Sequence, residues 1–346
     1  ANVYEATKDR GGISRYNGQE TISVSIQKQQ DSTDMEVSSA VKEKVEELMA
    51  DDSDLTITVA NDTSDTILDS LKDVAETMVL AVIICFPVVF LIVGSLMGTD
   101  ELNHYLGAVL GKADGFASWA LLPTYPTFKA YVQLLLDSPE FFVMFWNSVK
   151  MTGAILLGQI VTGVPAAWGF ARLDIPGKKV LFNLYIILML MPFQVTMLSN
   201  YLTLDAMHLV DTQWAVILPA AFSTFPVFIM YHFFRSIPKG IIESAELDGA
   251  NKFQVFLSIG VPLGSSGIVS ALVLSFLDAW NLIEQPLTFL KSKTLWPLSL
   301  YLPNISMDNA GLAFVASVIT LVPSLLVFLA GQNYLEQGIA ASAVKE

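Results

Sequence analysis

A polar, charged segment from Glu243 to Pro262, hereafter the polar segment, separates two long apolar stretches. It reads E-S-A-E-L-D-G-A-N-K-F-Q-V-F-L-S-I-G-V-P. Pro238 and the early acids predict a helix start, because proline suits a first turn and acids stabilise the positive end of the helix dipole. Gly249 permits a tight turn with positive φ. We therefore predict a short surface helix and a turn; on composition alone, an ordinary amphipathic connector is the alternative.

Polar side chains also lie within the apolar stretches themselves. Such groups are costly inside a membrane and often functional, so they are candidates for lining a pathway. Asparagine and glutamine also hydrogen-bond membrane helices together, and that structural role is the favoured one for most of them. Glu284 is the main exception, because it alone of the set is ionisable. The set is Asn147, Gln159, Gln194, Asn200, Asn281 and Glu284.

Other chemistries find little support in the sequence. Cys85 is the single cysteine and sits in an apolar run, so no disulfide within the chain forms and a buried, inert thiol is expected. The three histidines are scattered without ligand-like spacing, which argues against a metal site. No G-x-x-x-x-G-K-[ST] motif occurs; the run from Gly107 to Ala113 is one residue too short and lacks the hydroxyl. We predict no catalytic residue, no metal and no bound cofactor.

Composition indicates a membrane protein in two parts. Of 346 residues, 53% are hydrophobic and 15% charged, whereas soluble domains are charged at roughly a quarter of their positions. Residues 1–76 hold 17 Asp and Glu against 7 Lys and Arg, and the rest hold 16 against 12. We expect two different parts joined near Glu76. The chain begins at Ala1 without a removable signal pattern, and its start is expected to be a fragment boundary.

The first part alternates as soluble structure does. Apolar residues recur at every second position over Ile22–Ile26 and again over Leu55–Val59, as in half-buried strands. Between them, from Asp34, they recur every three or four residues, as in a helix. Asp62 and Ser64 are candidate caps for a further helix. The prediction is a small α+β, βαβ-like segment feeding a membrane helix.

The second part predicts an all-α membrane protein with six transmembrane helices. A bilayer core about 30 Å thick needs roughly 20 mostly apolar residues per helix. Prolines at 165, 192, 219, 226 and 323 imply kinks, and Trp168 and Trp214 are expected to be interfacial anchors. The predicted spans lie near 77–98, 143–171, 180–204, 214–235, 264–290 and 310–332.

Positive charge in the short loops sets the orientation. Cytoplasmic loops carry the excess of Lys and Arg, and such residues fall between spans two and three and between spans four and five. The loop over 203–213 contains no Lys or Arg. Lys291 and Lys293 lie on the predicted external side and therefore weaken the rule slightly. Both termini and the polar segment are predicted to be cytoplasmic, and residues 99–142 external.

The polar segment closely resembles the EAA loop of permease subunits in ABC importers, whose usual form is E-A-A-x-x-D-G-A followed by I-x-L-P. Ser244 replaces the first alanine and Val261 the leucine. Several further runs resemble permeases of carbohydrate ABC transporters, the group containing the maltose permease, from about residue 77 to the end. They are M-P-F-Q-V at Met191, I-L-P at Ile217, F-F-R-S-I-P-K at Phe233, A-W-N-L-I-E-Q-P-L at Ala279 and A-A-S-A-V-K-E at Ala340.

This resemblance implies a non-enzymatic transport subunit of the bacterial inner membrane, importing a sugar. Its coupling loop, residues 238–262, would dock on an ATPase dimer that binds ATP and Mg. The other implied partners are a second permease subunit, an extracytoplasmic solute-binding protein and the lipid bilayer, but no nucleic acid. The coupling residues carried over are Glu243, Ser244, Ala245, Asp248, Gly249, Ala250, Ile259 and Pro262, and the pathway candidates are Asn281, Glu284, Gln194 and Asn200.

Residues 1–76 resemble a different family. The runs R-Y-N-G-Q-E-T-I-S-V-S-I-Q-K-Q at Arg15, E-V-S-S-A-V at Glu36 and N-D-T-S-D-T-I-L-D-S-L-K-D-V at Asn61 look like the porter domain of resistance-nodulation-division efflux pumps. That segment is external in the pumps, whereas the permease topology places it inside. We interpret it as a fused or truncated remnant. The alternative functions are a proton-driven efflux component, for which the spans offer only Asp278 and Glu284 as acids, and a receptor-like scaffold.

Overall fold

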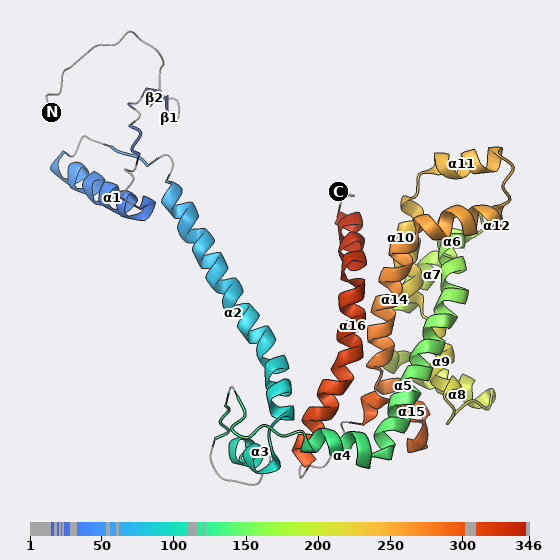
Figure 1. Ribbon diagram of the computed structural model, residues 1–346. Helices are drawn as coiled ribbons and strands as arrows, with labels where there is room; N and C mark the ends of the chain where they lie inside the picture. Colours follow the sequence, from blue (N-terminus) through green and yellow to red (C-terminus); the bar gives the residue numbers. More distant parts are fainter. Residues whose placement is uncertain are drawn as a thin grey trace. The chain divides into compact units, whose positions relative to one another are not determined.

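The computed structural model describes residues 15–16, 19–20, 22, 24–27, 33–52, 56–59, 62–109, 116–120, 122–301 and 309–343. The chain forms two compact units, Ala1–Phe86 and Pro87–Glu346, and helix α2 (Thr63–Ser95) runs from the first into the second. Figure 1 shows the order of the elements. Strand structure within the described residues is confined to β1 (Arg15–Tyr16) and β2 (Gln19–Glu20), which pair antiparallel.

In the first unit, Asp62 joins the start of α2 to helix α1 (Asp34–Asp51). Its carboxylate accepts the backbone N–H of Ser64 at 2.9 Å and thereby caps α2. It also accepts from Ser38 at 2.6 Å and pairs with Lys42 at 2.7 Å, both on α1. These bonds, led by that from Lys42, hold the pKa of Asp62 well below its ordinary value. One carboxylate therefore fixes the packing of two helices.

The strands predicted at Ile22–Ile26 and Leu55–Val59 are wrong for the described residues of both stretches, which carry no strand structure. Leu55 itself lies outside the described residues. Isolated strands need partner strands and a covered apolar face to be stable. Ile22 and Val24 are instead 93% and 77% exposed, so the alternating pattern has no core to bury it. The predicted helices form, but within the described residues of these stretches the βαβ-like arrangement does not.

The described residues contain four helices long and apolar enough to cross a membrane, and up to six spans if two bent pairs each count as one. Span Pro139–Arg172 comprises α5 (Pro139–Gly158), the π-helical turn η1 (Gln159–Gly163) and α6 (Val164–Arg172). Span Trp214–Ser236 comprises α9 (Trp214–Ala221) and α10 (Thr224–Ser236). The other two spans are Thr66–Ser95 in α2 and Ala310–Glu336 in α16 (Ala310–Ala343).

The two remaining predicted spans are broken. Over 180–204, α7 (Lys178–Leu190) and α8 (Phe193–Ala206) meet at 105°, because Pro192 has no N–H and keeps Met191 out of the helical region. Over 264–290, the prediction of one helix is wrong. Helix α14 (Ser265–Trp280) ends at Asn281, and α15 (Glu284–Phe289) is separate. Helix α14 and the helical stretch before it, Lys252–Leu263, instead form one of the two bent pairs, with a bend of 69° between them.

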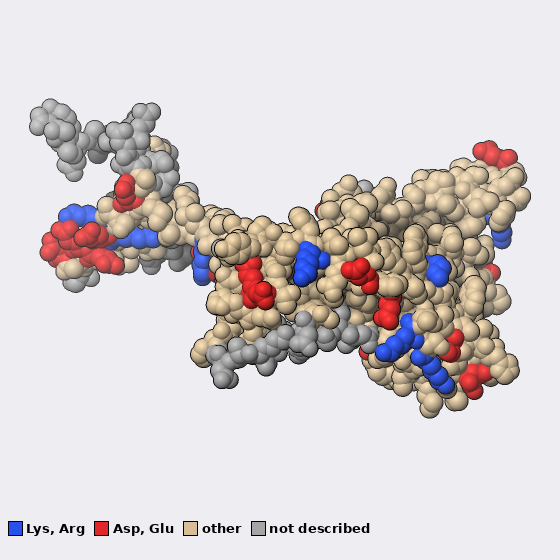
Figure 2. Space-filling view, turned by 60° about the horizontal axis from the view of Figure 1, so that its bottom comes forward, with Lys and Arg blue, Asp and Glu red and all other residues tan. Residues whose placement is uncertain are grey.

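Helix α14 lies at the centre of the second unit, in contact with α16, α10 and α5. Four short helices complete this unit: α3 (Thr99–Leu106), α4 (Lys129–Asp137), η3 (Lys293–Leu295) and η4 (Leu298–Leu300). In Figure 2 charged side chains crowd on the first unit, whereas those of the second are separated by uncharged surface. Such a surface suits a unit that is largely embedded in lipid.

Two predictions about single side chains are wrong. Trp168 is not an interfacial anchor: it is 6% exposed and packs against Phe234 and Phe256 with ring centroids 5.4 and 5.7 Å apart. Cys85 is exposed rather than buried, because it lies on a stretch of α2 whose neighbours along the helix are exposed as well. In both cases the position along an apolar run did not reveal which helix, if any, packs against the residue.

Candidate functional site

The first half of the polar segment is helix α11 (Lys239–Leu247), which begins at the cap residue Pro238. Gly249 has φ +91°, which confirms the predicted turn of positive φ. The N–H of Gly249 donates to Glu246 O at 3.1 Å, and that of Ala250 donates to Ala245 O at 3.0 Å. This pair of bonds is the Schellman ending of a helix, for which glycine is the preferred residue. Figure 1 shows α11 beyond the ends of the helices that precede and follow it.

The second half turns back as α12 (Lys252–Val255), the π-helical turn η2 (Phe256–Gly260) and α13 (Val261–Leu263). Asn251 starts α12 with a capping box: its side chain accepts the N–H of Gln254, and the Gln254 side chain accepts the N–H of Asn251, both at 2.9 Å. The sequence reasoning missed this box, although the spacing of Asn251 and Gln254 is its usual signature. Both halves of the polar segment therefore have defined ends.

Part of the polar segment is buried against the spans. Ala245, Ala250 and Ile259 are partly buried and pack on a core that contains Trp168 and Phe234. Gly260 makes the closest approach, since a Cβ there would lie 2.6 Å from the Trp168 ring. The predicted coupling residues of apolar type thus form the root of the polar segment, which is packed like a protein interior rather than suspended on a loop.

Arg172, at the end of α6, holds this root from the other side. Its Nε donates to Phe234 O at 2.9 Å, and Nη2 donates to Ile237 O and, at 3.3 Å, to Arg235 O. These carbonyls close α10 immediately before α11 begins. A cation at a helix C-terminus is also favoured by the helix dipole. In the sequence, Arg172 indicated only the cytoplasmic side of a loop. Its hydrogen-bond partners could not be predicted, because they lie more than 60 positions away.

The remaining predicted coupling residues, Glu243, Ser244, Asp248, Gly249 and Pro262, are exposed. So are three large apolar side chains: Leu247 at 88%, Phe253 at 67% and Leu257 at 49%. A shallow hollow of about 370 Å³ lies where the two halves meet, lined by Asp248, Gly249, Ala250, Gln254, Val255, Ser258 and Ile259. The outward surface therefore combines acids with apolar side chains, a composition suited to protein contact rather than to catalysis.

Two of the pathway candidates meet. Gln194 at the start of α8 donates to the Glu284 carboxylate at 2.7 Å, and both side chains are exposed. Asn281 donates to Leu277 O at 2.8 Å and lies where α14 ends. Asn200 lies on α8 and is partly buried. Glu284 and Asn281 were expected inside a continuous span, but Asn281 lies in the break after α14 and Glu284 is the first residue of α15.

Asn147 and Gln159 serve as structural residues. Asn147 is 3% exposed, donates to Thr294 O at 2.8 Å and Trp296 O at 3.1 Å, and accepts from Gln213 at 2.9 Å. Gln159 donates to Ala220 O at 3.0 Å, joining η1 to α9. Both residues therefore hydrogen-bond one element to another, which is the structural role favoured for most of the set.

The sequence reasoning also missed Asp211, in the connection between α8 and α9. Its carboxylate accepts the N–H groups of Lys291 and Ser292 at 2.8 Å each and the Ser292 hydroxyl at 2.7 Å. These bonds, first that from the Ser292 N–H, lower the pKa of Asp211. Its φ is +60°, an uncommon conformation outside glycine that aspartate tolerates better than most residues. No local motif marked it, because its partners lie 80 positions away.

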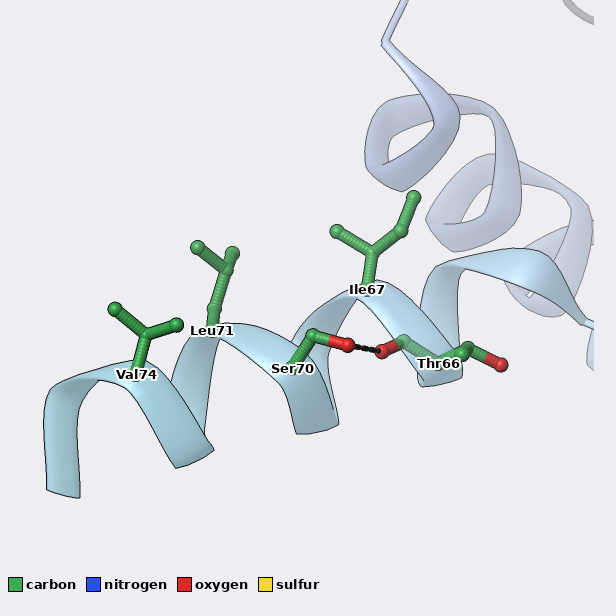
Figure 3. A pocket seen from close by; sticks show the side chains of 5 residues that line it. All are labelled: Thr66, Ile67, Ser70, Leu71 and Val74. Atoms are coloured by element: carbon green, nitrogen blue, oxygen red, sulfur yellow. Dashed lines mark hydrogen bonds between the residues drawn. The ribbon is translucent and has the colours of Figure 1, made fainter. Parts of the chain in front are cut away.

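A second hollow, of about 280 Å³, lies along α2 and is lined by Thr66, Ile67, Ser70, Leu71 and Val74. Figure 3 shows Ile67, Leu71 and Val74 pointing to the same side, while the Ser70 hydroxyl donates back to Thr66 O at 2.8 Å. The hollow is shallow and lined by one helix. It offers a ligand no convergent polar groups, and we assign it no site.

Two protein families match separate parts of the chain. Residues 159–341 match the family described as binding-protein-dependent transport system inner membrane component. Residues 1–99 match the AcrB/AcrD/AcrF family. Both resemblances found in the sequence are confirmed. The second match extends past residue 76, to the end of α2 and just beyond.

The relatives agree with the first match. The arabinooligosaccharides transport system permease protein AraQ of Bacillus subtilis is 27% identical over 271 residues, which cover 78% of this chain and 93% of AraQ. The lactose transport system permease protein LacG of Rhizobium radiobacter is 25% identical, covering 79% and 96%. Among solved structures, a chain of a bacterial ABC transporter involved in alginate import superposes with TM-score 0.67 at 20% identity, covering 81% of this chain and 99% of that one. This last similarity shows a shared fold.

Proposed function

Because the chain belongs to the family of binding-protein-dependent transport system inner membrane components, we propose that it is the permease subunit of an ABC importer for a sugar or oligosaccharide. Family membership makes it a multi-pass transport subunit of the inner membrane and not an ATPase. The carbohydrate assignment is supported by relatives named for arabinooligosaccharide and lactose transport. At 25–27% identity, the particular sugar stays open.

The polar segment, within the coupling loop 238–262, is the part that couples transport to ATP. One observation carries this proposal: α11 and its turn present exposed side chains such as Leu247, while Ala245 and Ile259 pack its root against the spans. An ATPase can move a membrane helix only through a projection that does not bend at its base. The root supplies that stiffness, and the exposed acids and apolar side chains supply the contact.

The partners follow from this role. An ATPase dimer holding ATP and Mg would bind the polar segment, and a second permease subunit would complete the pathway. A solute-binding protein would deliver the sugar on the opposite side, as the family name implies. This arrangement places the polar segment and both termini in the cytoplasm.

Gln194 and Glu284 are the proposed pathway contacts, with Asn281 and Asn200 nearby in sequence. The support is the 2.7 Å hydrogen bond between two exposed side chains at the start of α8 and of α15. Both groups lie in the first turns of helices that follow a break, and non-helical backbone within a membrane is tolerated only where it is buried in protein or lines a water-filled cavity. Alanine at either position is expected to raise the KM for sugar uptake. Co-purification of the ATPase is expected to change less.

A matched glycine pair tests the coupling assignment. Gly249 and Gly240 both lie in or beside α11, and a Cβ added at either meets nothing within 4 Å. Only Gly249 has positive φ, where alanine costs about 1–2 kcal/mol. Gly249→Ala and Glu243→Lys should weaken co-purification of the ATPase and uptake at least several-fold, while Gly240→Ala should not. Unchanged association and uptake in both variants would sink the assignment.

A proton-driven efflux component remains the second candidate, because residues 1–99 match the AcrB/AcrD/AcrF family. It predicts transport that collapses with a protonophore and persists without the ATPase. The importer proposal predicts that transport persists with a protonophore and stops without the ATPase. A transport assay that compares these two conditions therefore separates the candidates.

A further inference from the structure

Helix α4 (Lys129–Asp137) lies across the bundle rather than along it. Figure 1 shows it running beneath the ends of α5 and α16, and it contacts both helices. A single residue, Ser138, separates α4 from α5, where the span Pro139–Arg172 begins. Helix α4 is therefore held at the level where a membrane span starts.

One side of α4 is buried in protein. Leu134 is fully buried in a core that α5, α14 and α16 also build, and Ala130 and Tyr131 pack against the same core. The Tyr131 hydroxyl lies 2.8 Å from the Ser95 hydroxyl. These contacts fix the rotation of α4 about its own axis, so its other sides face defined directions.

The rest of the helix surface divides into two strips. At about 100° per residue, positions four apart fall on nearly the same side of a helix. Lys129, Gln133 and Asp137 make one exposed strip, which is polar throughout. The other strip is apolar and also exposed, and consists of Phe128 at 67%, Val132 at 51%, Leu135 at 39% and Leu136 at 76%. The helix thus has a protein side, a polar side and an uncovered apolar side.

The apolar strip has a continuation on the neighbouring span. Phe142, Val143 and Trp146 in the first two turns of α5 are exposed as well, and a membrane span presents such side chains to lipid. A helix at a span's end, with one apolar and one polar strip, has the pattern of a helix lying in the interface between lipid and water.

We propose that α4 lies in the membrane interface, with the apolar strip among lipid acyl chains and the polar strip in water. The lipid surface is the partner, and α4 sets the depth at which the bundle sits. Residues 99–142 were predicted to be on the external side, so α4 would lie in the external interface. The inference needs neither the sugar nor the coupling role, because it rests on α4 and on the membrane location alone.

Spin labels on the full chain test this proposal. In a Cys85→Ser background, single cysteines replace Val132, Leu136 or Gln133, and Leu326 on α16 serves as the lipid reference because it is 61% exposed within a span. The chain is reconstituted in bilayer nanodiscs of phosphatidylcholine and phosphatidylglycerol. Collision of the labels with oxygen, which concentrates in lipid, is compared with collision with a water-soluble nickel chelate.

The expected ratio of oxygen to nickel collisions at Val132 and Leu136 is several-fold above that at Gln133 and below that at Leu326, because an interfacial helix is shallower than the middle of a span. Equal ratios at Val132 and Gln133 would show that α4 lies in water and would overturn the proposal. Low accessibility to both reagents at Val132 and Leu136 would show a protein cover, such as a second copy, and would also overturn it. Quenching of a fluorescent label at Val132 by brominated lipid should agree with the spin-label result.

Discussion

Replacing Arg172 with methionine keeps a long side chain and removes every donor that holds the end of α10. In the structure, Nε donates to Phe234 O at 2.9 Å and Nη2 donates to Ile237 O. Helix α10 ends at Ser236 and α11 begins at Lys239, so these bonds fix the link between them. We expect Arg172→Met to loosen the root of the polar segment while the spans stay folded.

The size of the effect follows from the bonds that are lost. A hydrogen bond from a charged donor contributes about 1.5–3 kcal/mol, and partial exposure of Arg172 reduces this to about 1–2 kcal/mol each. Loss of a cation at a helix C-terminus adds about 0.3–1 kcal/mol. For the bonds to Phe234 O and Ile237 O together with the dipole contribution, the total of about 2–5 kcal/mol raises the local opening equilibrium about 30- to 4,000-fold, because 1.4 kcal/mol is tenfold.

Hydrogen exchange of the α11 amides in the full chain, in nanodiscs, measures this opening. Exchange should speed up at least tenfold in Arg172→Met. It should speed up less in Arg172→Lys, which keeps the charge but loses the planar guanidinium that donates several hydrogen bonds at once. Arg235→Met is the matched control, since the Arg235 guanidinium contacts the Tyr231 side chain, with Nη1 donating to the hydroxyl at 3.0 Å. Unchanged exchange in Arg172→Met, or equal acceleration in Arg235→Met, would refute the reasoning.

Three further outcomes are expected. Gly260→Ala should lower the thermal unfolding midpoint, because the new methyl group would lie 2.6 Å from the Trp168 ring, at a cost of about 1–3 kcal/mol; Gly153→Ala, with nothing within 4 Å, should not. Asp211 has a pKa below its ordinary 3.8, so its bonds contribute stability above that pH and lose it as pH falls through the folded-state pKa. The protection factor of the Ser292 amide, which corrects exchange for its intrinsic pH dependence, should therefore fall in acid, and in Asp211→Asn that fall should be absent. Removing residues 1–61 leaves α2 whole and should leave sugar uptake intact; lost uptake with normal membrane insertion would show that the first unit is required.

The polar segment could be predicted because its signals are local. The acids, Gly249 and the closing Pro262 all lie within 20 positions, and a glycine-ended helix depends on neighbours in sequence. Four of the six spans were predictable for the same reason, since an apolar run of sufficient length needs no other information.

Features that depend on distant partners could not be predicted. The proline at 192 indicated a kink, but its local chemistry did not predict that the angle between α7 and α8 would reach 105°. Trp168 was taken for an anchor, because the residues that bury its ring, Phe234, Phe256 and Gly260, lie more than 60 positions later in the sequence. The front strands were expected from alternation alone, which carries no information on whether partner strands exist.

In the polar segment, the residues that pack against the spans are different from the residues that are exposed. Ala245 and Ala250 pack inward at the root, while Leu247 and Phe253 on the same short stretch are exposed. Changes at the outward positions alter what the polar segment touches without altering how it is held. Under the proposed coupling role, recognition of the ATPase would be separable from the packing of the spans, because different side chains carry the two.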